Sequence, residues 1–416
     1  MIKRMLFKEL RDHLSQKEMT LIIGPRQAGK TTLMLLLRNY LDKKGERTVF
    51  LNLDIESDNR FFTSQLNLVK KIELEIGRDK GYVFVDEIQR KENAGLFLKG
   101  LYDMNLPYKF ILSGSGSMEL KEKIHESLVG RKRVFELSTL SFEEFFNFKT
   151  DYKYETKPQD FFSLDRERTT TFLNEYLNFG GYPRVVLEHS AQEKRNIMSE
   201  IYQSYLEKDI TYLLRVEKTA AFSDLVRAMA GQAGNLTNFS ELSSIVGIST
   251  KTVKDYLWYL EKTFILHKIT PYFRNLKKEI SKSPVYYFHD LGLRNYAAGV
   301  FGNVETSRDI GFVFQNFLFN FLTEKVESPS KISFWRTKDK AEVDFVISSA
   351  TEIIPIEVKH TALKKPKITR GLRSFIEKHQ PKRAFLVNLT LKETLNLDGT
   401  VIYFRPFYEI GDLGIP

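Results

Sequence analysis

The stretch from Thr20 to Leu33 constrains the fold most strongly. A short apolar run leads into Gly-x-x-x-x-Gly-Lys-Thr and then into a second apolar run. In the order strand, loop and helix, this pattern is typical of a loop that wraps a polyphosphate with backbone N–H groups. Gly24 and Gly29 permit the backbone geometry and the close approach that such a loop needs. Lys30 can reach the β- and γ-phosphates and the Thr31 hydroxyl can bind Mg²⁺, so the stretch predicts a nucleotide site.

Further along the chain, the apolar run Tyr82–Val85 ends in two acids. We expect Asp86 to hold the Mg²⁺ of the nucleotide together with Thr31, and Glu87 to act as the base that polarises the attacking water. The competing interpretation is a buried strand that ends in solvated acids. The nucleotide loop upstream favours the catalytic interpretation.

A third apolar run, Lys109–Leu112, ends in a stretch of serine and glycine. Ser113 either lies near the γ-phosphate or begins a plain loop, and both interpretations stay open. The residues expected to contact ATP come from the phosphate loop, the start of the helix and this serine. They are Gly24, Pro25, Arg26, Gln27, Ala28, Gly29, Lys30, Thr31, Thr32 and Ser113.

Two arginines are further candidates. Arg131, in Leu128-Val-Gly-Arg131, is a candidate arginine finger acting in cis or in a neighbouring subunit, and the alternative is a surface arginine. Arg184 could sense the phosphates from a helical lid, although we interpret it as structural. The alternation of strands and helices, with phosphate chemistry at the strand ends, predicts a parallel α/β sheet.

Three of these motifs resemble those of archaeal and bacterial AAA-type P-loop ATPases: Gly24–Thr32, Val83–Arg90 and Leu112–Ser115. Three others are similar to the branch of that family with a C-terminal restriction-endonuclease-like domain: Leu128–Arg131, Ser141–Phe145 and Gly180–Arg184. The resemblance implies an ATP-hydrolysing core with Glu87 as its base and sensor residues within 113–115.

Residues 236–262 read as a helix-turn-helix with Gly247 in the turn and Ser249 as a cap. Two apolar runs, 264–269 and 285–288, joined by a basic stretch at 274–278, would form a wing. Side chains early in the second helix could meet a major groove and its phosphates. They are Thr250, Lys251, Thr252 and Lys254. The alternative is a winged helix that serves only protein contacts.

The last segment of the chain contains a second group of candidate functional residues. Asp344 and Glu357-Val-Lys359 stand at the spacing of a signature that resembles PD-(D/E)xK nucleases. Asp344 and Glu357 would share a divalent cation, and Lys359, on the same strand face as Glu357, would orient or activate water. In that family a preceding helix supplies a glutamate, but this chain has Gln315, which brings no charge. This puts strand cleavage in question and leaves DNA binding open.

Basic residues follow this signature, and they form either a solvated face or a phosphate track. They are Lys364, Lys365, Lys367, Arg370 and Arg373. The chain has 63 Lys and Arg against 53 Asp and Glu, an excess that favours a polyanion such as DNA. It has no cysteine, a pattern that fits a reducing compartment, and no signal peptide or membrane-spanning run, so we expect a cytoplasmic protein.

The predicted organisation is a P-loop core at 1–150, a helical lid at 151–235, a winged helix at 236–300 and a nuclease-like α/β domain at 301–416. The leading hypothesis is an Mg²⁺-dependent ATPase that engages DNA, with a homo-oligomer completing the site if the arginine finger acts in trans. The alternatives are a low-turnover ATP-dependent switch and an ATP-gated endonuclease.

Overall fold

The computed structural model describes residues 2–115, 128–206, 219–273, 283–412 and 414. The chain forms two compact units, which are described separately. Unit 1 contains residues 1–144, 182–219 and 255–265, and unit 2 contains residues 145–181, 220–254 and 266–416. Helix α7 (Phe142–Lys149) and helix α14 (Thr250–Lys262) run across the unit boundaries.

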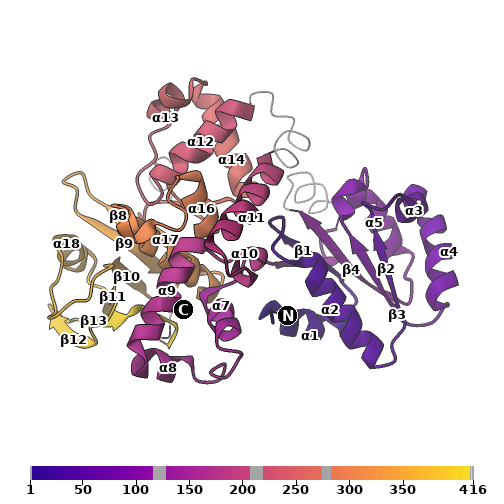
Figure 1. Ribbon diagram of the computed structural model, residues 1–416, viewed down its shortest axis with the longest axis horizontal. Coiled ribbons are helices and arrows are strands. Elements are labelled where there is room, and N and C mark those ends of the chain that lie inside the picture. Colours follow the sequence, from indigo (N-terminus) through magenta and orange to yellow (C-terminus); the bar gives the residue numbers. More distant parts are fainter. Residues whose placement is uncertain (1, 116–127, 207–218, 274–282, 413, 415–416) are drawn as a thin grey trace. The chain divides into compact units, whose positions relative to one another are not determined.

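Unit 1 is built on a five-stranded sheet in the order β2-β3-β4-β1-β5, and every neighbouring pair is parallel. Figure 1 shows this sheet with helices on both faces. The strands are β1 (Met19–Gly24), β2 (Thr48–Asn52), β3 (Gly81–Asp86), β4 (Tyr108–Ser115) and β5 (Lys132–Glu136). The helices are α1 (Leu6–Asp12), α2 (Lys30–Lys43), α3 (Glu56–Asn59), α4 (Gln65–Ile76), α5 (Ala94–Asp103), α10 (Pro183–Leu187) and α11 (Ala191–Ser204).

Strands β1, β3 and β4 are buried along their whole length, as apolar strands covered on both faces must be. Alternate residues enter different cores. Leu21 and Val83 pack with α4 and α5, whereas Ile22 and Phe84 pack with α1 and α2. The predicted parallel α/β sheet is therefore confirmed.

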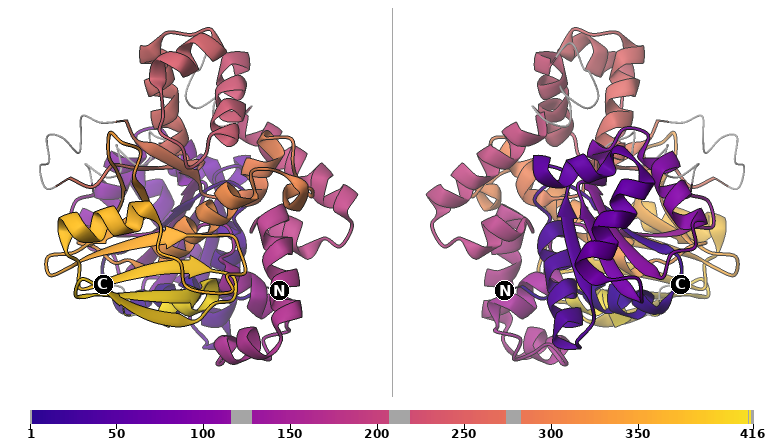
Figure 2. Two further views of the ribbon diagram at one scale, coloured as in Figure 1. Left: turned by 90° about the vertical axis from the view of Figure 1, so that its left-hand side faces the viewer. Right: turned by 90° about the vertical axis from the view of Figure 1, so that its right-hand side faces the viewer.

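Unit 2 contains a six-stranded mixed sheet in the order β12-β13-β11-β10-β9-β8. Helix α18 packs on one face through Leu372, Phe375 and Ile376. These strands are β8 (Lys331–Arg336), β9 (Glu342–Ser348), β10 (Ile353–Val358), β11 (Arg383–Asn388), β12 (Glu393–Leu397) and β13 (Thr400–Pro406). The flanking helices are α17 (Ile310–Lys325) and α18 (Arg370–His379). Figure 2 shows the sheet with α17 and α18 beside it.

The remaining elements of unit 2 are mostly helices. They are α8 (Pro158–Leu164), α9 (Arg166–Phe179), α12 (Thr219–Gly231), α13 (Phe239–Val246), α16 (Leu291–Ala297) and the antiparallel pair β6 (Leu266–Ile269) and β7 (Val285–Phe288). Asn238 caps α13, and Gly247 ends it in the left-handed conformation at φ +72°. The predicted basic connection at 274–278 lies outside the described residues. Asn316 of α17 bonds both the N–H (2.9 Å) and the C=O (2.8 Å) of Phe288, so the strand pair is docked on α17.

The unit division cuts the predicted lid at 151–235 into three pieces, of which the first and the last belong to unit 2. Residues 145–181 belong to unit 2, where the Asn295 amide donates to the carbonyls of Leu177 (2.7 Å) and Asn178 (3.0 Å). Asp290, which caps α16, also accepts a hydrogen bond from the N–H of Gly181 (2.9 Å). Only residues 182–219 of the predicted lid share a unit with the nucleotide loop.

None of the helices in the described part of the chain has the length and hydropathy that crossing a bilayer requires.

At the amino edge of the unit 1 sheet, His13 is buried beside Thr20 and Lys109. Its Nδ1 lies 2.8 Å from the Thr20 hydroxyl and 3.3 Å from the Lys109 ammonium. Because the ammonium can only donate, Nδ1 must act as an acceptor and the ring must be neutral. Burial, reinforced by the positive charge of Lys109, lowers the pKa of His13 to about 4.

This depressed pKa makes unit 1 sensitive to acid. The unfolded ring takes up a proton near its ordinary pKa of 6.5 and the folded ring only near 4. The stabilisation is therefore complete above pH 6.5 and is lost as the pH falls toward 4. We expect this one group to remove up to about 3 kcal/mol of unfolding free energy across that interval. Denaturant unfolding over the same pH range should show a smaller acid loss in His13→Gln than in wild type. The exposed His189→Gln is the matched control, and equal acid losses in all three proteins would contradict the assignment.

Candidate functional site

The phosphate loop joins β1 to α2 in the geometry that the sequence predicts. A Cβ atom at Gly24 would collide with the carbonyl oxygen of Leu137, whose N–H donates to the Ile23 carbonyl (2.8 Å). Gly29 has φ +97°, a value that favours glycine, and precedes the first helical residue, Lys30. The close approach of the Leu137 backbone therefore leaves no room for a side chain at Gly24.

Lys30 lies inside this loop. Its ammonium donates to the carbonyls of Gly24 (2.9 Å) and Pro25 (2.7 Å), and the residue is buried. The charge is thereby held at the centre of the predicted phosphate site.

Asp86 connects the ends of neighbouring strands. Its Oδ2 accepts a hydrogen bond from the Thr31 hydroxyl (2.7 Å), and its Oδ1 accepts one from the Ser113 hydroxyl. The backbone N–H of Glu87 also donates to Asp86 Oδ1 (3.1 Å). The structure thus brings together Thr31, Asp86 and Ser113 from three separate motifs.

These residues fit the predicted ligands. The Thr31 hydroxyl and the Asp86 carboxylate are oxygen donors, the type that Mg²⁺ prefers, and nucleotide phosphates and water complete such sites. A cavity of about 550 Å³ opens over the loop, within the range of small-ligand sites. Its lining includes seven of the predicted nucleotide contacts and the predicted base. These are Arg26, Gln27, Ala28, Gly29, Lys30, Thr31, Thr32 and Glu87.

Glu87 follows Asp86 in the left-handed conformation, at φ +58°. Burial raises the pKa of its carboxyl group, while the Lys30 charge acts in the opposite direction. The Gln89 side-chain amide donates both to Glu87 Oε2 and to the Ser115 hydroxyl (3.0 Å). Gln89 therefore fixes the orientation of Glu87 relative to the end of β4. Sequence analysis missed this residue.

Arg4 and Glu144, which no sequence prediction named, also support the phosphate loop. The Arg4 guanidinium donates to the loop carbonyl of Ala28 (2.8 Å) and to Ser138 (2.7 Å), and it pairs with Glu144 (3.0 Å). Both side chains of the ion pair are almost completely buried. Glu144 also accepts from the Ser141 N–H, while Ser141 caps the Glu144 N–H, a capping box. The pattern Ser-x-x-Glu was a sequence signal for Glu144, whereas no sequence pattern identifies Arg4.

The structure corrects our interpretation of Arg184 as purely structural. Its guanidinium lines the cavity and donates to the side-chain oxygen of Gln27 in the loop (3.1 Å) and to Glu200 (3.1 Å). The motif around it, Gly180-Gly-Tyr-Pro-Arg184, thus contributes an arginine to the nucleotide cavity.

Arg131 lies elsewhere. It immediately precedes β5, whose first residue pairs with Met19 at the amino edge of the sheet, whereas the loop leaves the carboxyl edge. Its guanidinium pairs with Asp103 (2.9 Å). The prediction of an arginine finger in cis is therefore wrong, because the residue lies at the opposite edge from the cavity.

In unit 2, the four residues predicted to contact DNA lie at the start of α14. The Ser249 hydroxyl accepts from the Thr252 N–H (3.1 Å) and caps the helix. Lys251 and Lys254 are exposed, and the Lys254 ammonium lies 5.2 Å from the centre of the Phe239 ring. These two lysines can reach an external ligand, while Thr250 is half-buried.

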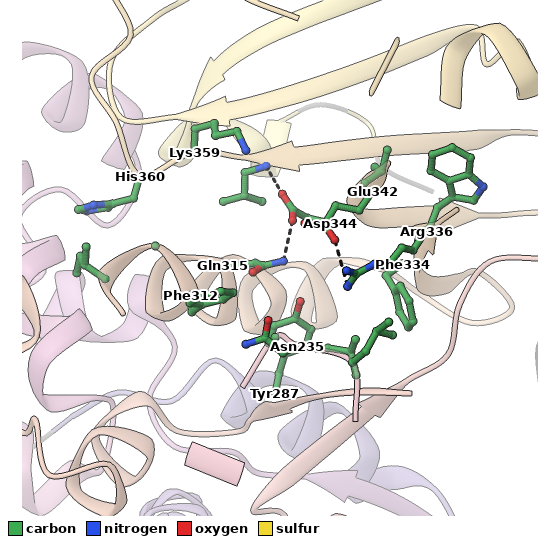
Figure 3. Close-up of a pocket in the computed structure, with 18 of the residues that line it drawn as sticks. Asn235, Tyr287, Phe312, Gln315, Phe334, Arg336, Glu342, Asp344, Lys359 and His360 are labelled. Carbon is green, nitrogen blue, oxygen red and sulfur yellow. Dashed lines mark hydrogen bonds and ion pairs between the residues drawn. The ribbon is translucent and has the colours of Figure 1, made fainter. Parts of the chain in front are cut away.

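Asp344 of the predicted carboxylate pair lines a second pocket, of about 450 Å³, shown in Figure 3. Strands β9 and β10 pair antiparallel as far as Phe345 with Ile356, so one step further Asp344 lies opposite Glu357. Asp344 Oδ2 accepts from the Val358 N–H (2.7 Å), and Glu357 Oε1 pairs with the Lys359 ammonium (2.9 Å).

Gln315 of α17 donates its amide N–H to Asp344 Oδ1 (2.8 Å), as Figure 3 shows. Three of the four carboxylate oxygens of Asp344 and Glu357 therefore already accept hydrogen bonds, and only Glu357 Oε2 has none from the described residues. No group of three or more acid, histidine or cysteine side chains that could hold a metal occurs in the described ranges. The predicted cation site at Asp344 and Glu357 therefore stays a prediction, and no metal-dependent cleavage step is derived from it.

The environment of Asp344 and Glu357 disfavours the charged forms of both carboxyl groups. Burial and the neighbouring Glu357 raise the pKa of Asp344 to about 7, while the Val358 N–H and the Lys359 charge act in the opposite direction. Burial also raises the pKa of Glu357, against the effect of Lys359. The pocket therefore carries less negative charge near neutral pH than two ordinary carboxylates would give it.

Three family models match consecutive parts of the chain. Residues 16–146 match a model described as an AAA domain. Residues 170–303 and 310–407 match two models described as domains of unknown function (DUF8612 and DUF4143). The AAA match agrees with the geometry of the loop and of Asp86, and the prediction of a P-loop, AAA-type ATPase domain is confirmed.

Similar curated proteins are themselves uncharacterized. One from Mycobacterium tuberculosis is 25% identical over 381 residues, covering 91% of this chain and 78% of the relative. One from Haemophilus influenzae is 25% identical over 395 residues, covering 92% of both chains. A third, from Methanocaldococcus jannaschii, is 24% identical over 349 residues, with 83% and 75% covered.

Solved structures with a similar arrangement include the Orc1 protein of Aeropyrum pernix in complex with DNA. It has 11% identity and a TM-score of 0.30, with 70% of this chain and 91% of that chain covered. AMPPCP-bound DnaA from Aquifex aeolicus has 16% identity and a TM-score of 0.26, with 62% and 86% covered. The winged-helix and restriction-endonuclease-like assignments have no match among these findings and stay predictions.

Proposed function

We propose that this protein is an Mg²⁺-dependent ATPase that binds ATP in the cavity over the 24–32 loop and engages DNA through unit 2. The observation that carries the proposal is the meeting of Thr31, Asp86 and Ser113 beside the buried carboxyl group of Glu87. A carboxylate anchored on a helix-start hydroxyl, next to a second acid of raised pKa, suits phosphoryl transfer to water.

Each residue of the cavity has a defined part in this reaction. Lys30 and the loop N–H groups bind the β- and γ-phosphates, and Arg184 adds charge from α10. Glu87 takes a proton from the attacking water as the new oxygen–phosphorus bond forms and ADP leaves. Thr31 and Asp86 would hold Mg²⁺, which when bound would supply charge neutralisation to the phosphates. Arg131 has no place in this cavity, so a finger role for it requires a neighbouring subunit.

The test is ATP turnover by three variants, with and without DNA. We expect Glu87→Gln to lower kcat by about a hundred-fold or more while nucleotide binding persists, because the base is lost and the loop is intact. Lys30→Ala should abolish nucleotide binding. The exposed Glu92→Gln is the matched control. Equal turnover in wild type and Glu87→Gln would remove the base assignment. Tight ATP binding with negligible wild-type turnover would identify a nucleotide-dependent switch instead.

Gln89 provides a sharper test of the base. Its N–H stabilises the charged form of Glu87, so Gln89→Ala should raise the pKa of Glu87 further and move the acid limb of the kcat profile to higher pH. We expect a loss of about ten-fold in kcat at neutral pH, with KM unchanged, because orientation of the base is impaired. The exposed Gln192→Ala is the control. An unshifted acid limb would show that Gln89 does not position Glu87.

DNA engagement is supported by the exposed lysines at the start of α14. We expect the double variant Lys251→Glu, Lys254→Glu to weaken duplex binding and to reduce the salt slope of log K by about two, because each phosphate contact contributes about one ion. Fluorescence anisotropy at several salt concentrations measures both quantities. The control changes two exposed lysines elsewhere in unit 2, Lys153→Glu and Lys157→Glu. If the control variant lost the same DNA affinity, the effect would be due to net charge and not to the position of Lys251 and Lys254.

A further inference from the structure

The pocket beside Asp344 has features that the proposed ATPase reaction does not use. Its 450 Å³ are lined from three directions: the turn after α12, the first turn of α17, and strands β8 to β10. Gly234, at φ +85°, forms part of the lining, and a Cβ there would approach the Phe312 ring and the Gln315 amide oxygen to 3.3 Å and 3.2 Å. The glycine therefore keeps open the space between an aromatic ring and an amide.

Phe312 is the exposed aromatic residue of this pocket. Its side chain lies on the first turn of α17 and is 39% exposed, while Phe334 and Trp335 behind the pocket are buried. Figure 3 shows Phe312 beside Gln315 on the same helix. An exposed ring on a rigid helix is a platform on which a nucleic-acid base can stack.

Polar groups surround this platform. The Asn235 side chain is exposed and makes no hydrogen bond with the described residues, and the Gln315 amide oxygen faces the same space. Side-chain amides can read the edges of an unpaired base. Val313 is the first residue of α17 with a full helical hydrogen bond, to Asp309, so the N–H groups of Gly311 and Phe312 are not used by the helix.

Cationic side chains stand at the rim. Arg308 is exposed and makes no ion pair within the described ranges, and the Lys359 ammonium is 43% exposed beside Glu357. The acids of the pocket are already engaged: Glu342 pairs with Arg336 (3.4 Å), and both oxygens of Asp344 accept N–H groups. With the pKa of Asp344 raised to about 7, repulsion of a phosphate is reduced at neutral pH.

We propose that this pocket binds one unpaired nucleotide of a single-stranded nucleic acid, with its base stacked on Phe312 and its phosphate near Arg308 and Lys359, without a divalent cation. This inference rests on the proposed DNA engagement and specifies the form of nucleic acid that unit 2 takes. The exposed lysines after β10, at 364, 365 and 367, follow Lys359 in the chain and are candidates for further phosphate contacts.

The experiment measures anisotropy of labelled oligothymidine and oligouridine of about 20 nucleotides, and of a duplex of equal length, each in EDTA and in Mg²⁺. We expect single strands to bind the full-length protein equally well in EDTA and in Mg²⁺. Phe312→Ala should weaken this binding about ten-fold or more, the loss expected when one stacked base loses its ring, whereas Phe312→Tyr should retain it. Lys359→Gln should reduce the salt slope by about one.

The control is Phe321→Ala, which removes the same side chain from the same helix outside the pocket. Binding that requires Mg²⁺, or that Phe312→Ala and Phe321→Ala weaken equally, overturns the proposal. Duplex binding without single-strand binding also overturns it while leaving the proposed DNA engagement intact. ATP turnover of Phe312→Ala, measured in parallel and expected to match wild type without DNA, separates this outcome from failure of the ATPase assignment. Preference for one oligonucleotide over the other assigns DNA or RNA.

Discussion

The organisation of unit 1 depends on one carboxylate, that of Asp86, at the carboxyl edge of a parallel sheet. Because β4 lies between β1 and β3, the end of each strand contributes to the same small region: the loop after β1, the acids at the end of β3 and the serines at the end of β4. Thr31 of α2 and Ser113 of β4 each donate a hydrogen bond to a different oxygen of this carboxylate. A displacement of any of these strands would separate the hydroxyls from the acid.

The sequence was sufficient for this region because its signals are local. An apolar run, a glycine loop and a lysine at fixed spacing determine a strand, a turn and a helix, and parallel pairing then brings the strand ends together. It was insufficient where a role depends on partners distant in the chain. The sequence around Arg131 does not show at which edge of the sheet this residue lies. Arg4 lies 140 residues from Glu144, so no local pattern connects the two. Gln89 lies in the sequence between the acids and an arginine, and the functional interpretation was given to charged residues instead.

In unit 2, too, the sequence pattern predicts some features of the candidate site and not others. Asp344 and Glu357, grouped by their spacing in the sequence, lie on neighbouring antiparallel strands. What spacing cannot give is the identity of the hydrogen-bond donors around them. The Gln315 amide on a separate helix and the Val358 N–H each donate to one oxygen of Asp344. The segment 151–235, predicted as one lid, is shared between the two units, and buried amides such as Asn295 bind backbone carbonyls that no side-chain pattern reveals.

The capping box that joins Ser141 to Glu144 has a consequence for biosynthesis. Glu144 holds Arg4, and Arg4 holds the Ala28 carbonyl, so the phosphate cradle needs side chains from both ends of a segment that ends at residue 144. During translation this cradle stays incomplete until that glutamate has left the ribosome, long after the glycine loop itself has emerged. The six-stranded sheet is synthesised later still, so the nucleotide cradle is complete in the growing chain before any of the strands at 331–406 exist.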